Sequence, residues 1–139
     1  MTYEEKGKWI YLATTVLGFV VYVGVILNRA QDMAITEVPY ISTILWIIGI
    51  ALVVTILGQI AIAIAKPSEA DKKDERDKDI NRKGDFVGGI VLGVAMIVPF
   101  GLTMAEFDHF WIANAMYSAF VLSAIISTMV KIVAYRRGL

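Results

Sequence analysis

The side chains best suited to chemistry lie close together near residue 108. Glu106, Asp108 and His109 form a candidate outer mouth, and His109 is the only histidine of the chain. Carboxylates and an imidazole can bind a divalent metal, and two copies of the chain could supply paired histidines to a haem. A metal- or haem-binding membrane protein is therefore one of three functions that we consider, after a partner or regulatory protein and a transporter or channel. The same residues are typical of a solvated turn. No serine lies near His109 and no nucleophile motif appears, so we expect no enzyme, no resident metal and no cofactor.

Two polar pairs interrupt otherwise apolar segments. Thr55 and Gln59 are one helical turn apart, and so are Asn114 and Ser118. In a membrane such side chains commonly form hydrogen bonds between helices, worth about 0.6–2 kcal/mol each. The alternative is that they contact a polar ligand inside the bundle. No ionisable residue lies in the middle of an apolar segment, which disfavours an ion-coupled transporter but leaves a facilitated pathway or a channel open.

Four apolar segments must position these residues, at about 9–28, 40–65, 86–104 and 110–135. Each can cross roughly 30 Å of hydrocarbon at about 1.5 Å per helical residue. Hydrophobic residues make up 58% of the 139 residues, above the roughly 45–50% of soluble domains, and the mean hydropathy is +0.67. An open strand in lipid would leave backbone groups unsatisfied. The pattern therefore predicts a single membrane domain, an all-α integral membrane four-helix bundle made of two helical hairpins.

The distribution of positive charge predicts the orientation. Of the 13 Lys and Arg residues, all but Arg29 lie in the N-terminal segment, in the polar connector 66–85 or near the C-terminus. Positive residues accumulate on the cytosolic side of a membrane. We therefore expect both termini and the connector in the cytosol, in the plasma (inner) membrane of a bacterium or archaeon. The connector has as many acidic as basic residues, so we expect no nucleic-acid partner. Without cysteine, neither disulfides nor thiolate metal sites can form.

Small residues form two candidate packing surfaces. Gly89 and Gly93 make a Gly-x-x-x-Gly motif in the third span. The fourth span has small residues at intervals of four: Ala115, Ala119, Ser123 and Ser127. Such surfaces let helices approach closely in lipid, and we expect them to join the third and fourth spans, or one of them to face a second copy in a homo-oligomer, in the first instance a dimer. Pro99 cannot donate to the Ala95 carbonyl and should bend the third span.

The polar connector has two interpretations. Ser68 could cap a helix with Asp71 three residues later, and Lys73 could pair with Asp77 across one turn. The connector would then be a solvated helical extension that fixes the spacing of the spans. In the other interpretation it docks a cytosolic or membrane protein partner. The candidate docking residues are Asp74, Glu75, Arg76 and Asp77.

A resemblance rests on the same segment. The Asp-Glu-Arg-Asp motif at 74–77, followed by Arg-Lys-Gly-Asp at 82–85 on entering a span, resembles an uncharacterised family of small prokaryotic four-helix membrane proteins with this motif before the third membrane helix. The blocks at 108–115 and 133–138 are also similar, so the resemblance covers roughly the second half of the chain. Such proteins are often encoded beside small helix-turn-helix regulators. The resemblance thus implies a membrane partner in regulation and no particular chemistry.

These observations favour a small integral membrane protein that is not an enzyme and acts through protein–protein contacts, as a partner or regulatory protein in the lipid bilayer. The alternative is a small oligomeric transporter or channel. Neither interpretation names a ligand, because the sequence contains no motif that recognises one.

Single cysteines test the orientation, because the natural chain has none. We expect a membrane-impermeant maleimide applied to intact cells to label Ile35→Cys, in the loop between the first two spans, and to spare Glu75→Cys in the connector. Labelling after permeabilisation is the control for reactivity. Labelling of residue 75 but not of residue 35 in intact cells would place the termini outside.

Overall fold

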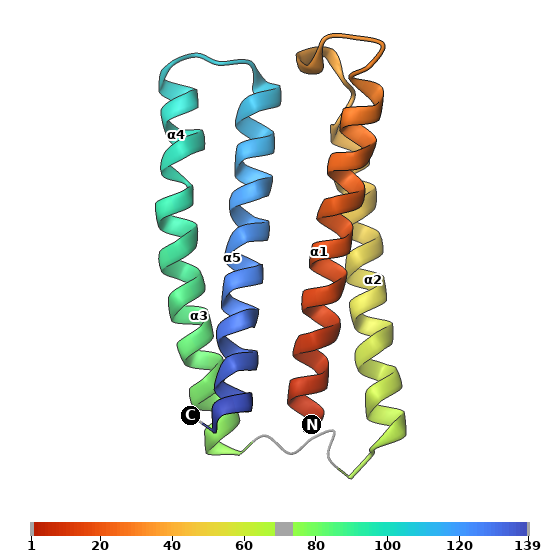
Figure 1. Cartoon of the computed structure of the whole chain (residues 1–139), viewed down its shortest axis with the longest axis vertical. Coiled ribbons are helices and arrows are strands. Elements are labelled where there is room, and N and C mark those ends of the chain that lie inside the picture. The colour runs from red at the N-terminus through yellow and green to blue at the C-terminus, as the bar shows by residue number, and fades with distance from the viewer. Residues whose placement is uncertain (1, 69–73, 139) are drawn as a thin grey trace.

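The computed structural model describes residues 2–68 and 74–138. Its α-helices are α1 (Tyr3–Arg29), α2 (Ile41–Ala65), α3 (Glu75–Ala95), α4 (Ile97–Met104) and α5 (His109–Arg137), and a short 3-10 helix, η1 (Ile35–Glu37), lies between α1 and α2. The described residues contain no strand. The all-α four-helix bundle is therefore confirmed, with one hairpin made of α1 and α2 and the other of α3, α4 and α5 (Figure 1).

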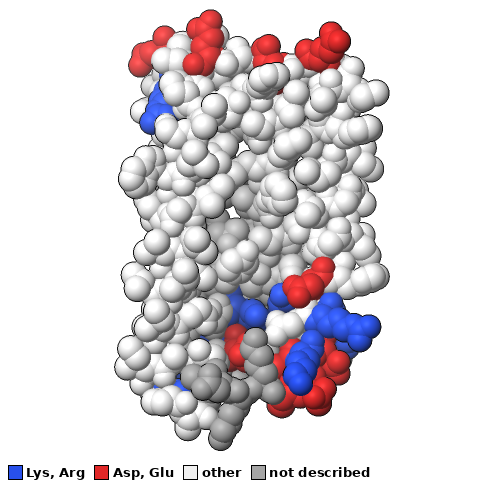
Figure 2. All heavy atoms as spheres, turned by 180° about the vertical axis from the view of Figure 1, so that it is seen from behind, with Lys and Arg blue, Asp and Glu red and all other residues white. Residues whose placement is uncertain are grey.

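In the described part of the chain, four helical segments are long and apolar enough to cross a membrane, and α3 and α4 together form one of them. On the face shown in Figure 2, charged side chains gather at the two ends of the molecule and are absent from a broad band between them. Both chain termini lie at one end (Figure 1), which we call the termini end; the other is the opposite end. These are the features of a multi-pass membrane protein.

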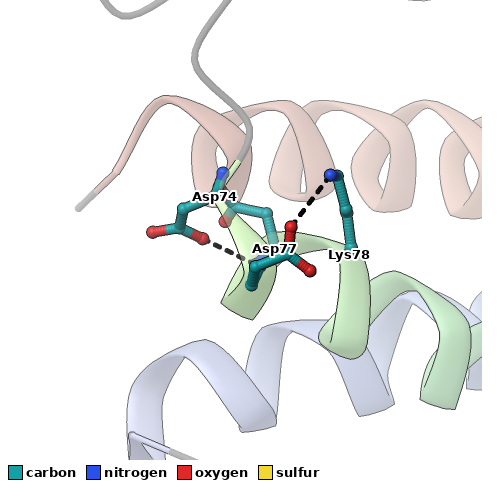
Figure 3. A network of polar contacts seen from close by, with 4 residues as sticks. Asp74, Asp77 and Lys78 are labelled. Carbon is teal, nitrogen blue, oxygen red and sulfur yellow. Dashed lines mark hydrogen bonds and ion pairs between the residues drawn. The ribbon is translucent and has the colours of Figure 1, made fainter.

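Helix α3 begins at Glu75, well before residue 86, where the sequence predicts the third span to start. Asp74 caps the helix: its Oδ1 accepts from the backbone N–H of Asp77 at 2.8 Å, and Oδ2 of Asp77 accepts from the backbone N–H of Asp74 at 3.2 Å (Figure 3). This reciprocal capping box satisfies two backbone donors. The cap of this helix is thus Asp74 rather than Ser68, and Asp71 and Lys73, the expected partners of Ser68 and Asp77, lie outside the described residues.

The bend expected at Pro99 is a break between α3 and α4 at Met96. Pro99 has no N–H to donate to the carbonyl of Ala95, so one backbone bond of the ladder is missing. Helical bonds continue on both sides of the break, from the N–H of Met96 to Leu92 at 2.9 Å and from the N–H of Phe100 to Met96 at 3.1 Å. The interruption is therefore confined to about one turn.

The helices pack in the order α2, α1, α5, α3, with α4 continuing α3 along α5. Helices α1 and α5 thus lie in the middle and provide the main contact between the hairpins (Figure 1). Helix α2 packs on α1, and the described residues make no comparable contact between α2 and α3. The bundle is consequently not closed all round, and its two outer helices bound an opening.

Close packing of α3 on α5 depends on Gly84 and Gly88. A Cβ atom on Gly88 would lie 2.8 Å from Cβ of Ser127, and one on Gly84 would lie 2.9 Å from the carbonyl oxygen of Ser127. The hydroxyl of Ser123 donates to the carbonyl of Gly88 at 2.7 Å. Small residues and a hydrogen bond therefore hold this helix pair together, as lipid requires.

This contact corrects one packing prediction and supports another. A Cβ atom added to Gly89 or Gly93 would meet no neighbouring atom within 4 Å, so this motif does not join the third and fourth spans. The reason is register: the face of α3 that meets α5 contains Gly84 and Gly88, one position before the predicted motif. On α5, Ser123 and Ser127 make the contact, Ala119 is buried and Ala115 is half-buried.

Paired substitutions test this register. Overpacking a tight helix contact costs about 1–3 kcal/mol, whereas Gly→Ala at an unobstructed helical position gains up to about 1 kcal/mol. We expect Gly88→Ala to lower the midpoint of thermal unfolding in detergent, followed by circular dichroism, and Gly93→Ala to leave it unchanged or raise it. Equal midpoints for the two variants would contradict the described packing of α3 on α5.

Candidate binding cleft

A cleft of about 480 Å³ lies between the two hairpins in the half of the bundle nearer the termini end. The face shown in Figure 2 is hollowed between its two halves. Residues of α1, α2, α3 and α5 line the cleft, so it exists only in the folded bundle. Its polar lining residues are Lys8, Tyr11, Thr55, Gln59, Asp85, Ser123, Ser127, Thr128 and Lys131.

A second cavity of about 330 Å³ lies deeper in the bundle, between α1, α2 and α5. Its lining is mostly apolar and includes Ile47, Ile48, Leu52 and Val121. Four residues line both cavities: Tyr11, Thr55, Phe120 and Ala124. The two cavities therefore adjoin, and we treat them as the polar section and the apolar section of one cleft.

Charged side chains from both hairpins line the polar section. Lys131 of α5 extends its Nζ to within 2.6 Å of Oδ1 of Asp85 on α3, and Lys8 comes from α1. The side chain of Lys131 is only 13% exposed, whereas that of Asp85 is 69% exposed. The mostly buried stem of Lys131 thus lines the cleft, and its ammonium group reaches the exposed carboxylate of Asp85.

The pair Thr55 and Gln59 lies in the wall of this cleft. Nε2 of Gln59 donates to the backbone carbonyl of Gly7 at 3.3 Å and joins α2 to α1. Gly7 permits this approach, because a Cβ there would lie 2.7 Å from Nε2 of Gln59. Thr55 lines both sections. Both interpretations of the pair therefore have a structural counterpart: Gln59 is an interhelical contact, and the pair borders a space that can hold a ligand.

An apolar cluster closes the bundle towards the opposite end. Tyr22, Ile26, Val38 and Phe110 are buried together there. Tyr22 packs its ring 5.0 Å from that of Tyr117. Such aromatic contacts add to the burial of apolar area. A ligand inside the cleft is thus separated from the opposite end by packed side chains.

Asn114 belongs to this closure and not to the cleft. Its Oδ1 accepts a hydrogen bond from the hydroxyl of Tyr22, and its Nδ2 donates to the carbonyl of Phe110 at 2.7 Å. The side chain therefore links α5 to α1, as interhelical hydrogen bonds in membranes do. Ser118, its predicted companion, is exposed.

An ion pair between a buried carboxylate and an exposed guanidinium joins the same two helices at the termini end. Nε of Arg136 lies 2.6 Å from Oε1 of Glu5. The side chain of Glu5 is only 7% exposed, and a buried carboxylate is tolerated when a cation compensates its charge. Helices α1 and α5 are thus connected by polar contacts at both ends of the bundle.

The connector residues make contacts within the chain. Arg76 donates to the backbone carbonyl of Tyr135 at 3.2 Å and lies 5.7 Å from the centre of its ring. The hydroxyl of Tyr135 donates to Oδ1 of Asp77 at 2.6 Å. Asp74 caps α3, and Glu75 pairs with Lys78 at 3.1 Å. We call the contact of Arg76 and Asp77 with Tyr135 the connector latch, and it fixes the start of α3 on the end of α5.

The residues of the predicted outer mouth point into solvent. Glu106, Asp108 and His109 are all exposed, and Glu106 has a φ of 58° in the tight turn before α5. In residues 2–68 and 74–138, no three His, Cys, Asp or Glu side chains are placed to hold a metal ion together. The structure therefore leaves this mouth as a charged surface turn.

The sequence pattern alone does not predict that Lys8, Tyr11, Asp85 and Lys131 line one cleft. One signal was present on α5, where Lys131 continues the interval of four that contains Ser123 and Ser127, and so shares their face. The contributions of α1 and α3 had no comparable signal, because their residues meet only when the hairpins pack.

Comparisons with protein-family models, with curated proteins and with solved structures found no match. The resemblance of the Asp-Glu-Arg-Asp segment to small prokaryotic membrane proteins accordingly stays a prediction.

The connector latch can be tested at Tyr135. Tyr135→Phe keeps the ring beside Arg76 and removes the hydrogen bond to the Asp77 carboxylate, and such charge-assisted bonds contribute about 1.5–3 kcal/mol. We expect a loss of about 1–2 kcal/mol in the free energy of unfolding, since the site is only partly buried. Denaturant titration in detergent measures it. Tyr3→Phe, on α1, is the matched control, and an equal effect of both variants would argue against the latch.

Proposed function

We propose that this chain is a small, non-enzymatic membrane transporter that loads its ligand from the termini end. The observation behind this proposal is the one-sided cleft: all four membrane-crossing segments line a polar space near the termini end, and the Tyr22 cluster closes the bundle towards the opposite end. A site between two helical units that is accessible from one side is what a transporter requires before it changes conformation.

The arrangement of the hairpins supports such a change. They meet mainly through α1 and α5, and the cleft lies between them. Rocking of one hairpin against the other around this contact would open the opposite end and narrow the termini end. The contacts that must then exchange are Glu5 with Arg136 at one end and Tyr22 with Asn114 at the other.

The lining argues for facilitated rather than ion-coupled movement. The described residues around the apolar section include no Asp, Glu, Lys, Arg or His. Lys8, Asp85 and Lys131 all belong to the polar section near the termini end. A proton- or ion-coupled carrier generally needs an ionisable group deeper in the membrane.

A partner or regulatory protein is the second candidate. The first turns of α3 expose a mixed-charge surface that includes Glu75, Lys78, Asp79, Arg82 and Lys83. This surface can meet another protein even though Arg76 and Asp77 are engaged by Tyr135. In either role the proposal places the chain in a prokaryotic plasma membrane with cytosolic termini, following the Lys and Arg distribution. A homo-oligomer could form through the exposed face of the third span around Gly93, whereas Gly89 lines the cleft.

Cysteine accessibility tests the transport proposal. Thr55→Cys places a thiol in the cleft, whereas Leu57→Cys places one on the exposed, lipid-facing side of the same helix. An impermeant maleimide needs water and a thiolate to react. We expect the thiol at residue 55 in vesicles of known orientation to react rapidly from the termini side and slowly from the opposite side, and that at residue 57 to react from neither.

The pattern of labelling separates the possible roles. Reaction of residue 55 from the termini side alone would indicate a binding protein without transport. Absence of reaction from both sides would remove the cleft as a functional site and leave the partner-protein candidate.

A further inference from the structure

We propose that the apolar section of the cleft binds an uncharged aromatic compound with carbonyl oxygens, of the naphthoquinone type. This inference rests on the proposed function and adds the chemical class of its ligand. It depends on three properties of the section: threonine hydroxyls that make no hydrogen bond within the described residues, aromatic rings in the wall, and a volume of about 330 Å³.

The threonines that line the apolar section differ in their hydrogen bonds. The hydroxyl of Thr14 donates to the carbonyl of Ile10 at 2.8 Å, as threonine commonly does inside a helix. Thr15 of α1 and Thr55 of α2 line the same section, and neither side chain makes a hydrogen bond with another described residue. A hydroxyl among apolar side chains is unfavourable when it lacks a partner. An occupant that accepts hydrogen bonds would therefore be stabilised there.

The two threonines lie on facing helices at different depths. Helices α1 and α2 are antiparallel (Figure 1), and Gly7 of α1 approaches Gln59 of α2. Counting from this contact towards the opposite end, Thr15 lies eight residues away along α1 and Thr55 four residues away along α2. The difference of four residues corresponds to about 6 Å along the helix axis. Hydroxyls at this spacing suit two acceptors on opposite sides of one ring, as in a naphthoquinone.

The wall of the apolar section favours a flat, uncharged ring system. Tyr11, Tyr117 and Phe120 contribute aromatic rings, and Tyr117 is itself stacked on Phe19 with 5.8 Å between the ring centres. Aromatic rings pack favourably on one another at such distances. The described residues of the lining include no Asp, Glu, Lys, Arg or His. A charged ring compound would therefore lose its hydration there without gaining a partner of opposite charge.

The volume of the section agrees with a compound of two fused rings. An apolar protein cavity of about 150 Å³ holds benzene, and the apolar section has about 330 Å³. Because Tyr11, Thr55, Phe120 and Ala124 line both sections, a compound that enters the polar section can pass from it into the apolar section. The site thus lies on the path that the proposed transport requires.

Equilibrium dialysis of the whole protein in phosphatidylcholine nanodiscs tests the inference, with the bound compound measured by mass spectrometry. Empty nanodiscs give the partition into lipid, which is subtracted. The probes are dimethylnaphthoquinone, whose methyl groups block the addition of amines to its ring, dimethylnaphthalene, which lacks the carbonyls, and naphthoate, which is charged. We expect the naphthoquinone to bind saturably and at least about tenfold more tightly than either of the others, because two hydrogen bonds are lost without the carbonyls.

Valine variants assign the binding to the hydroxyls, because valine nearly keeps the shape of threonine. Thr15→Val and Thr55→Val should each weaken the naphthoquinone about fivefold and change the affinity for dimethylnaphthalene less than about twofold, which also shows that the variant is folded. Thr14→Val is the matched control in the same wall: its hydroxyl is already bonded to Ile10, so either affinity should change less than about twofold. Ala51→Phe fills the section and should weaken both neutral compounds.

Four results would overturn the inference: no saturable binding above that of empty nanodiscs, equal affinity for the naphthoquinone and dimethylnaphthalene, equal losses with Thr55→Val and Thr14→Val, or naphthoate binding as tightly as the naphthoquinone. Labelling of Thr55→Cys from both sides combined with any of these would keep the transporter and reject this class of ligand. Labelling from the termini side alone, combined with the expected binding, would reject transport and keep the ligand.

Discussion

Helices α1 and α5 are joined by polar contacts at both ends, by Glu5 with Arg136 at the termini end and by Tyr22 with Asn114 at the opposite end. Lipid tails give helices no hydrophobic reason to associate, so such contacts and close backbone packing must hold the bundle together. The other helices attach to this central pair, α2 to α1 and α3 to α5. The space left between the outer helices is the cleft, which therefore depends on how this one pair is fixed.

The connector takes part in the same construction. Asp74 caps the N-terminus of α3, and Arg76 and Asp77 bind Tyr135 near the end of α5. Acidic side chains in the first turn also suit the positive end of the helix dipole. A highly charged segment thus anchors a membrane hairpin, and in its described part Glu75 pairs with Lys78 and Asp85 pairs with Lys131 of α5.

The cleft combines a polar section and an apolar section. The polar section lies at the border between the apolar band and the charged termini end. The apolar section extends from there towards the Tyr22 cluster, which closes the opposite end. Two glycines in the wall of the cleft allow close contacts with the neighbouring helix: Gly7 lets Gln59 approach, and Gly88 lets Ser127 approach. The same small residues that allow close packing within each hairpin therefore also line the space between the hairpins.

The sequence by itself determined the helical class and the four apolar segments, because in lipid every backbone group must be satisfied within its own helix. It also located the break near Pro99, since the missing donor is a local property. Only the tertiary structure decided that Gly84 and Gly88, rather than Gly89 and Gly93, face α5, and that Lys8, Gln59, Asp85 and Lys131 border one cleft. The apolar faces of a membrane helix are alike in composition, so hydropathy leaves its rotation and its neighbours undetermined; these follow from the mutual fit of side chains distant in sequence.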